Sequence, residues 1–385
     1  MKILFITNLY PYDIDFEQDK NTKALYNITK LWDEDLEVIR PLFLPTEFKD
    51  LIEKKVYKKN KVLINNVKVH VLPICKIPGK NIYFYKSLIR YVKRNQISPD
   101  VIITHRLHSA IGASKLARIY NKPLILGLHN ADILYLRNSK MKNYYLDLFE
   151  QAVFVACRSQ SILNEITKIY PQYTHKYFIA FSGIEKSIIN PIEKTLTKVQ
   201  EWKGKERPIR FITAATLKKL KNIDINLRAL SMLNKTIKWE YYIIGDGNEM
   251  VYLKNLSQEL GISNRVFFLG KKSRAEVLTY MEKSDIFIMV SEPETFGLSY
   301  IEAMAKGCIV IGALNNGIDG VVQDGFNGFL CTPRSVEELT DKIGMISSMD
   351  ISELSDIILQ TNQTIIEYTE ENAARTYIEK VRTCI

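Results

Sequence analysis

Cysteine is scarce in this sequence, and its arrangement argues against two kinds of site. The 385 residues include five cysteines, an odd number, and none lie at C-x-x-C spacing. This pattern indicates neither a disulfide framework nor a thiolate metal site. We expect no signal peptide, because the first residues enter a strand-like run directly. No stretch reaches ~18 uncharged apolar residues, the length of a membrane-spanning helix. We therefore expect a cytoplasmic protein that can rest on the inner face of a membrane.

Acidic residues are under-represented in the first half of the chain. Residues 1–190 carry 29 basic and 17 acidic side chains, whereas residues 191–385 carry 24 and 26. Segment 51–100 alone holds 12 basic and 2 acidic residues, a surplus equal to the +10 of the whole chain. This asymmetry predicts an anionic partner for the first half. No nucleic-acid-binding motif accompanies the charge, so we expect no nucleic acid among the partners.

Short apolar runs alternate with longer amphipathic segments along the chain. Runs such as 2–7, 101–104 and 286–290 are continuous and rich in Ile, Val and Phe, as in strands buried on both faces of a parallel sheet. The alternation predicts a doubly wound α/β fold. It breaks once, in the polar segment 185–207, where we place the entry to a second Rossmann-like domain.

The most informative local sequence is the segment SEPETFGLSYIEAMAKGCIVIG. It follows an apolar strand, 285–290, passes through a loop that contains Gly297, and enters a helix predicted over 299–306. The end of such a strand and the start of the next helix are where α/β sheets bind ligands, and the free N–H groups suit a phosphate. Glu294 in the loop and Glu302 in the helix would then bind hydroxyls, which indicates a phosphate that bears sugars. Without that ligand, both would be ordinary solvated charges.

The Glu294-x7-Glu302 block, with its internal Phe-Gly-Leu, resembles the signature of the retaining glycosyltransferases of family 4, which have the GT-B fold. Five other stretches are similar to that family in order and spacing: 242–247 (YIIGDG), 264–270 (NRVFFLG), 321–330 (VVQDGFNGFL), 128–132 (LHNAD) and 181–185 (FSGIE). The resemblance covers most of the chain and is most specific over 210–335.

The resemblance implies two Rossmann-like domains that face a central cleft. We expect an acceptor domain over 1–188, a nucleotide-sugar donor domain over 189–365, and a final helix over 366–385 that crosses back to the first domain. It also implies catalytic roles for Glu294, His129 and Lys221, with Lys221 neutralising the diphosphate and His129 touching the transferred sugar. It implies that these residues bind the donor: Glu302, Thr295, Phe296, Gly297, Leu298, Ser299, Thr216, Val266, Phe268 and Gly183.

The sequence departs from the family pattern at two places. Thr216 stands where the family has an arginine, and Lys218 or Lys219 can supply a charge there, although an ammonium is not equivalent to a guanidinium at phosphate. The first loop, Thr7–Lys23, contains no glycine, whereas the family's glycines allow the backbone to approach the diphosphate.

Other residues of the first half are candidates for contact with an acceptor or a membrane. His105 and His108 follow a predicted strand and are candidate acceptor contacts. A helix predicted over Lys80–Arg94 places apolar residues on one stripe and basic residues elsewhere. Its basic side chains form either a solvated face or a surface attracted to anionic lipid: Lys86, Arg90, Lys93 and Arg94.

The resemblance thus implies the transfer of a hexose-type sugar from a UDP- or GDP-sugar to a glycan or lipid-linked acceptor, with retention at the anomeric carbon. We expect no cofactor and no essential metal, and a role in bacterial surface polysaccharide or glycolipid assembly. Two alternatives stay open: a nucleotide-sugar 2-epimerase of the same fold, and a catalytically silent subunit that binds glycan or nucleotide sugar.

Overall fold

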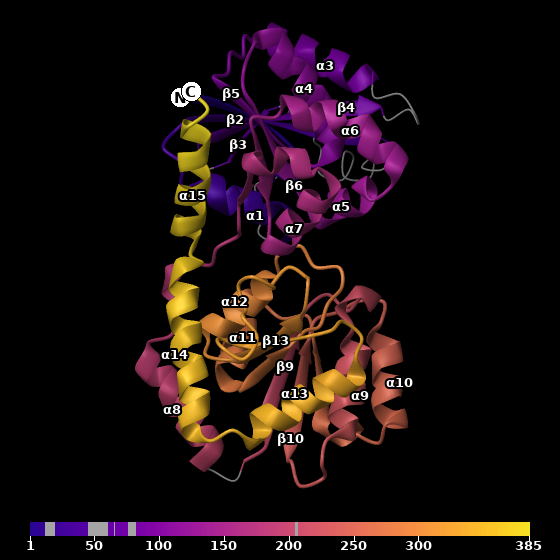
Figure 1. Cartoon of the computed structure of the whole chain (residues 1–385), viewed down its shortest axis with the longest axis vertical. Helices are drawn as coiled ribbons and strands as arrows, with labels where there is room; N and C mark the ends of the chain where they lie inside the picture. Colours follow the sequence, from indigo (N-terminus) through magenta and orange to yellow (C-terminus); the bar gives the residue numbers. More distant parts are fainter. Residues whose placement is uncertain (12–19, 45–60, 65, 76–81, 205–206) are drawn as a thin grey trace. The chain divides into compact units, whose positions relative to one another are not determined.

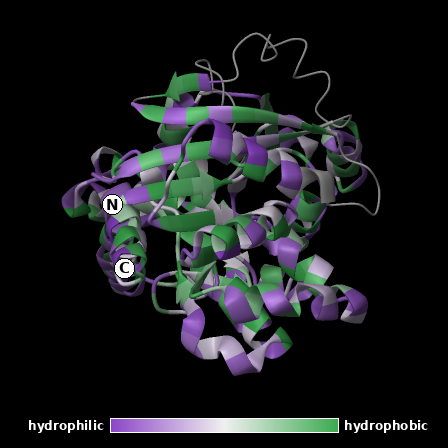
Figure 2. Ribbon diagram, turned by 90° about the horizontal axis from the view of Figure 1, so that it is seen from above, coloured by the Kyte–Doolittle hydropathy of each residue, from purple (hydrophilic) through white to green (hydrophobic). Residues whose placement is uncertain are grey.

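The computed structural model describes residues 1–11, 20–44, 61–64, 66–75, 82–204 and 207–385. The chain divides into two compact units: unit 1 comprises Met1–Gly183 and Glu370–Ile385, and unit 2 comprises Ile184–Thr369. The sequence analysis placed the domain boundaries after residues 188 and 365. The chain passes between the two units a few residues away, after Gly183 and after Thr369. Both chain termini lie in unit 1, close to one another (Figures 1 and 2).

Unit 1 is built on an eight-stranded sheet with the order β3-β4-β2-β1-β5-β6-β7-β8. All neighbouring strands are parallel except β3, which pairs antiparallel with β4. The strands are β1 (Lys2–Ile6), β2 (Asp35–Leu44), β3 (Lys61–Ile64), β4 (Val67–Cys75), β5 (Val101–His105), β6 (Leu124–Leu128), β7 (Phe154–Cys157) and β8 (Tyr177–Ile179).

Helices cover both faces of this sheet. The α-helices of unit 1 are α1 (Lys20–Thr29), α3 (Ile82–Arg94), α4 (Leu107–Tyr120), α5 (Asn130–Leu136), α6 (Ser139–Gln151), α7 (Gln160–Ile169) and α15 (Glu370–Arg382), and Pro171–Lys176 is a 3-10 helix. Leu4 and Ile6 of β1 pack in a core with α3 to α7, whereas Ile3 and Phe5 pack in a second core with α1 and α15. The alternation of side chains along a strand therefore supplies both cores. In Figure 2 the strands are mostly hydrophobic, whereas the helices carry residues of both kinds.

Unit 2 has a six-stranded parallel sheet with the order β11-β10-β9-β12-β13-β14. The strands are β9 (Ile209–Ala214), β10 (Trp239–Ile244), β11 (Val266–Gly270), β12 (Ile286–Ile288), β13 (Ile309–Ala313) and β14 (Phe329–Cys331). The strand order reverses between β9 and β12, which makes the carboxyl ends of these two strands the expected ligand-binding edge.

The helices of unit 2 form a layer on each side of its sheet (Figure 1). Helices α9, α10 and α13 pack together, and α11 and α12 pack together. The α-helices are α8 (Ile192–Gly204), α9 (Ile223–Met232), α10 (Met250–Glu259), α11 (Arg274–Lys283), α12 (Leu298–Ala305), α13 (Val336–Ser348) and α14 (Ile351–Glu367); short 3-10 helices are Lys186–Ile188, Lys219–Lys221 and Ser263–Arg265. Among the described residues, no helix is long and apolar enough to cross a bilayer.

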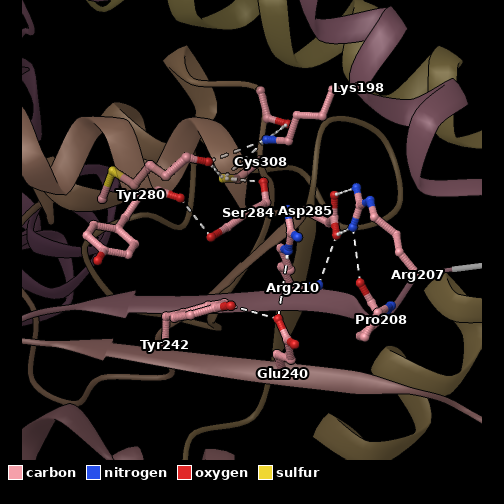
Figure 3. Close-up of polar contacts among 12 residues, drawn as sticks. Lys198, Arg207, Pro208, Arg210, Glu240, Tyr242, Tyr280, Ser284, Asp285 and Cys308 are labelled. Atoms are coloured by element: carbon pink, nitrogen blue, oxygen red, sulfur yellow. Dashed lines mark hydrogen bonds and ion pairs between the residues drawn. The ribbon is translucent and has the colours of Figure 1, made fainter. Parts of the chain in front are cut away.

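A polar network closes the amino edge of the second sheet, where β9, β12 and β13 begin (Figure 3). Arg207 donates two hydrogen bonds of 2.7 Å to the carboxylate of Asp285, whose side chain is fully buried. The backbone N–H of Arg210 donates a third bond to the same carboxylate at 2.9 Å. Lys198 of α8 reaches the carbonyl oxygens of Met281, Lys306 and Gly307 at 3.4, 3.3 and 2.9 Å. These groups tie the starts of neighbouring strands together.

The doubly wound α/β prediction is confirmed in both units. Segment 185–207, which we separated because it lacks strand character, contains helix α8. Strand β3 was not predicted, because its four residues follow a lysine-rich run that hides the alternation. The basic run 54–60 and most of the glycine-free first loop lie outside the described residues.

Candidate functional site

The loop between β12 and α12 carries the first candidate residue, Glu294. Gly297 precedes α12 with φ +85°, a left-handed conformation that favours glycine. A Cβ at this position would lie 2.4 Å from the ring of Tyr300, so the close packing of that ring also requires glycine. Tyr300 in turn donates to the carbonyl oxygen of Met289, just after β12. The glycine therefore fixes the direction in which the loop enters the helix.

Glu294 and Lys221 form an ion pair at this edge. The Nζ of Lys221 lies 2.5 Å from Oε2 of Glu294, and the two side chains are 18% and 14% exposed. Glu294 also accepts from the hydroxyl of Ser291 at 3.2 Å and from the backbone N–H of Thr295 at 3.1 Å. The amide oxygen of Asn316 accepts from the backbone N–H of Glu294 at 3.3 Å. Lys221 follows β9 and Glu294 follows β12, so the adjacency of these strands brings the two predicted residues together.

Glu302 lies one turn into α12 and is held by an arginine that the sequence analysis missed. Arg274, the first residue of α11, donates from Nε to Oε1 of Glu302 at 2.9 Å, and its Nη1 donates to Glu185. The carboxylate of Glu302 is 16% exposed, whereas that of Glu185 is 45% exposed. The Ser-x-x-Glu capping box over 273–276 could have predicted the start of α11 from the sequence. It gives no sign that Arg274 bonds to Glu302.

The other predicted donor-binding residues lie at several places in unit 2, except Gly183, which belongs to unit 1. Thr295, Leu298 and Ser299 are partly exposed beside Glu294, whereas Phe296 is 4% exposed. Thr216 is exposed between β9 and Lys221. Gly183 is buried at the last position of the first stretch of unit 1.

Val266 and Phe268, the candidate base contacts, line a cavity of about 380 Å³ at the sheet edge. Their strand, β11, is the edge strand, and α10 contributes the other wall through residues that include Lys254 and Gln258. The Nζ of Lys254 lies 5.9 Å from the centre of the Phe268 ring. Phe267, between them, stacks on Tyr242 with ring centres 5.2 Å apart.

In unit 1, His129 follows β6 and lies beside His105, the last residue of β5. Nδ1 of His105 is 3.1 Å from Nε2 of His129, and Nε2 of His105 is 2.8 Å from the hydroxyl of Tyr377 on α15. A Cβ at Gly127 would lie 2.3 Å from the His105 ring, so glycine makes room for this imidazole. Asp132 accepts from the backbone N–H of His129 at 2.9 Å and fixes the turn.

The two imidazoles differ in what they can contact. His105 is fully buried with both ring nitrogens bonded, so it has no surface to offer to an acceptor. His129 is partly exposed. Burial is the main cause that lowers the pKa of both histidines well below the ordinary value, and both are therefore neutral at pH 7. His108 is exposed on α4, with its ring edge towards Tyr135.

The basic residues of α3 all lie on its solvent side. Its apolar stripe, which includes Leu88 and Val92, is buried in the core of unit 1. The predicted charges are exposed: Lys86, Arg90, Lys93 and Arg94. In the part of the chain that the structure describes, no group of three His, Cys, Asp or Glu side chains could hold a metal ion.

Comparisons with known proteins agree with this architecture. The family model described as "Glycosyl transferases group 1" matches residues 195–367, and that described as "Glycosyltransferase Family 4" matches residues 43–184. The chain is 28% identical over 220 residues to the N-acetyl-alpha-D-glucosaminyl L-malate synthase of Bacillus anthracis, a match that covers 57% of each protein. It thus spans little more than half of that relative.

Two solved structures show the same fold over the full chain. One is Anabaena HepE in complex with UDP, with a TM-score of 0.75, 22% identity and complete coverage of both chains. The other is the apo form of the lipopolysaccharide outer core galactosyltransferase WaaB, with a TM-score of 0.72, 17% identity and complete coverage of both chains. Two parallel-sheet α/β units, each matched by its own family model, establish that the chain belongs to the group 1 glycosyltransferases of GT-B fold.

Proposed function

We propose that the protein transfers a hexose-type sugar from a nucleotide-diphosphate sugar to an acceptor hydroxyl, with retention at the anomeric carbon. The observation that carries the proposal is the Lys221–Glu294 pair beside the N-terminus of α12, at the ligand-binding edge of the second sheet. It unites a cation suited to a diphosphate with a carboxylate suited to sugar hydroxyls. Family membership supports the same reaction class.

Lys221 has bonding capacity to spare for a ligand. An ammonium group has three N–H donors, and among the described residues its hydrogen-bond partner is Glu294. A diphosphate can therefore bind at Nζ, where the negative charge that grows on the leaving group is stabilised. Glu294 would then turn its oxygens to the transferred sugar, and Glu302 would bind the ribose hydroxyls. His129 is proposed to contact the sugar. In this proposal no metal is needed, because Lys221 and the backbone N–H groups meet the charge.

The proposed donor is a UDP-sugar, and the proposed setting is bacterial surface polysaccharide or glycolipid assembly. The UDP complex of HepE supports the nucleotide, and the similarity to a lipopolysaccharide galactosyltransferase supports the setting. The acceptor is proposed to be a glycan or a lipid-linked glycan.

Purified protein incubated with a panel of UDP- and GDP-sugars, with and without candidate glycan acceptors, tests the reaction. Mass spectrometry should detect a glycosylated acceptor and the free nucleoside diphosphate, and EDTA should leave the rate unchanged. Epimerised sugar without an acceptor would instead identify a 2-epimerase. Binding of UDP with no turnover of any donor would identify a silent binding subunit.

We propose further that α3 attracts unit 1 to anionic membranes. Because its apolar stripe is buried, the face that remains for a membrane is the basic one, and the attraction is electrostatic rather than by insertion. Each Lys or Arg close to anionic lipid contributes roughly 1 kcal/mol.

Co-sedimentation with phosphatidylglycerol vesicles at low salt tests the membrane proposal. The wild type should bind and should be released by salt, since exposed charges are screened. Replacing Lys86, Arg90, Lys93 and Arg94 with Glu should abolish binding and leave UDP affinity unchanged. If the wild type does not co-sediment with these vesicles, the basic side chains of α3 form only a solvated face, and a soluble acceptor is favoured.

A further inference from the structure

Arg158 is a buried cation without an acidic partner among the described residues. It follows β7 directly and is 2% exposed. Its Nη2 donates to the hydroxyl of Ser182, and its Nη1 is buried with no hydrogen-bond partner in the described part of the chain. Arginine is almost never fully buried unless it is paired, because an isolated charge loses its hydration. Burial lowers the pKa of this guanidinium to about 10, as expected for a cation that lacks a counter-ion.

Polar residues converge on Arg158 from the ends of neighbouring strands. His105 ends β5, His129 follows β6, Arg158 follows β7 and Ser182 follows β8, and these four strands are consecutive and parallel in the sheet. Their carboxyl ends therefore meet at one edge. The charge of Arg158 adds to burial in lowering the pKa of both imidazoles, which places it near them. This group supplies donors and a positive charge, and none of its members is acidic.

The carboxylate of Asp132, which lies at the same edge, is already engaged. Asp132 accepts from the backbone N–H groups of His129 and Leu107, at 2.9 and 3.2 Å. Its interactions with charged groups are with Arg106 and His108, not with Arg158. Among the described residues, Arg158 thus has no counter-ion, although an apolar side chain would be more stable there, a pattern expected at functional sites.

We propose that Arg158, Ser182 and His129 form an anion subsite that holds a phosphate or carboxylate group of the sugar acceptor. A guanidinium offers two parallel donors to such a group, which gives both charge and orientation. Of the residues at this edge described above, His129 is partly exposed, and we place the entrance of the subsite beside it. Naming the acceptor as the source of the anion rests on the proposed function; binding of the anion itself does not.

Histidine resonances provide a direct test, because the chain has five histidines. In protein labelled with ¹⁵N-histidine, assigned with His105→Gln and His129→Gln, titration with inorganic phosphate should shift the His129 and His105 signals saturably. In Arg158→Met the phosphate affinity should fall about ten- to a hundredfold, the value of a charged hydrogen bond. Unchanged signals in the wild type, or an equal response in Arg158→Met, would overturn the proposal.

Thermal stability separates this role from a structural one. In phosphate-free buffer, Arg158→Met should melt at a higher temperature than the wild type, because it removes an unpaired buried charge. A lower melting temperature would show that the guanidinium serves the fold, which would overturn the proposal. Arg118→Met is the matched control: Arg118 pairs with Asp147 on the surface, and its loss should alter neither the histidine response nor, by more than about 0.5 kcal/mol, the stability.

Saturating UDP distinguishes the two sources of an anion. If the subsite serves the acceptor, phosphate should still shift the His129 signal in UDP-saturated protein, and a phosphate- or carboxylate-bearing sugar should replace inorganic phosphate. If UDP removes the response, the anion is the donor's diphosphate and the acceptor assignment is wrong. Calorimetry that shows no UDP binding would count against the proposed function, while the phosphate response in the absence of UDP still tests the subsite.

Discussion

Two lysines at opposite ends of the second sheet show how the same side chain serves different purposes. At the amino edge, Lys198 reaches three backbone carbonyl oxygens within 3.4 Å, so its donors are all used (Figure 3). At the carboxyl edge, Lys221 is held by the side chain of Glu294, which a ligand can displace. A donor bound to backbone is fixed by the fold, whereas a donor bound to a side-chain carboxylate can exchange that partner for a ligand.

The carboxylates at the two edges follow the same division. Asp285 is fully buried and accepts two guanidinium donors and one backbone donor. Glu294 and Glu302 keep partial exposure and are held by side chains from other segments. The amino edge is therefore expected to serve stability and the carboxyl edge to serve binding and catalysis.

Removal of the buried carboxylate should have the largest effect. Asp285→Ala leaves Arg207 without its partner and should lower the free energy of unfolding by about 3 kcal/mol, measured by urea denaturation. At a temperature where the variant is folded, its UDP affinity should match the wild type. A loss below about 1 kcal/mol would contradict the structural role of this edge.

Glu294→Ala should lower kcat by about a hundredfold or more and leave the melting temperature nearly unchanged, because the residue lies in a loop and is proposed to orient the transferred sugar. Glu292→Ala is a matched control in the same loop, since Glu292 pairs with Arg334 on the surface. A near-normal kcat in purified Glu294→Ala would show that Glu294 is not a catalytic residue.

Lys221→Ala should weaken the binding of the nucleoside diphosphate about ten- to a hundredfold in calorimetry, the value of a charged hydrogen bond. Lys198→Ala should leave this affinity unchanged and lower stability instead. Lys218→Ala and Lys219→Ala should have smaller effects, unless one of them replaces the arginine that is absent at Thr216. Equal UDP affinity in the wild type and Lys221→Ala would show that Lys221 does not bind the nucleotide, and the proposed difference between the two edges would be wrong.

The smallest expected effect is a pH dependence of stability caused by His105, the buried histidine of unit 1. His105 has its pKa lowered mainly by burial, so below its ordinary value of 6.5 the unfolded chain takes up a proton that the folded chain does not. Stability should therefore fall as the pH is lowered from 7.5 to 5.5, by up to about 1.4 kcal/mol for this group. His105→Gln should reduce that dependence in urea denaturation at the two pH values. An identical pH dependence in the variant would indicate that His105 is accessible to protons.

Sequence reasoning located Glu294 and Glu302 because both lie within one continuous segment. The strand, the loop with Gly297 and the helix are local features of the sequence, and they place Glu294 in the loop and Glu302 in the helix. Arg274 was not found, since its link to Glu302 depends on how α11 packs beside α12. His105 was a candidate acceptor contact, but the strand pairing that sets it over Gly127 buries it.

The sequence by itself determined the alternation of strands and helices and the two-domain organisation, because hydrophobic periodicity depends on neighbouring residues, and the strand–loop–helix segment singled out Glu294 and Glu302. Lys221 was assigned through the resemblance to the family. Only the tertiary structure decided which charges meet. Lys221 and Glu294 are 73 positions apart, and they touch because β9 and β12 are adjacent in the sheet. The lack of an acidic partner for Arg158 among the described residues is decided in the same way, because it depends on which side chains the ends of β5 to β8 bring to that edge.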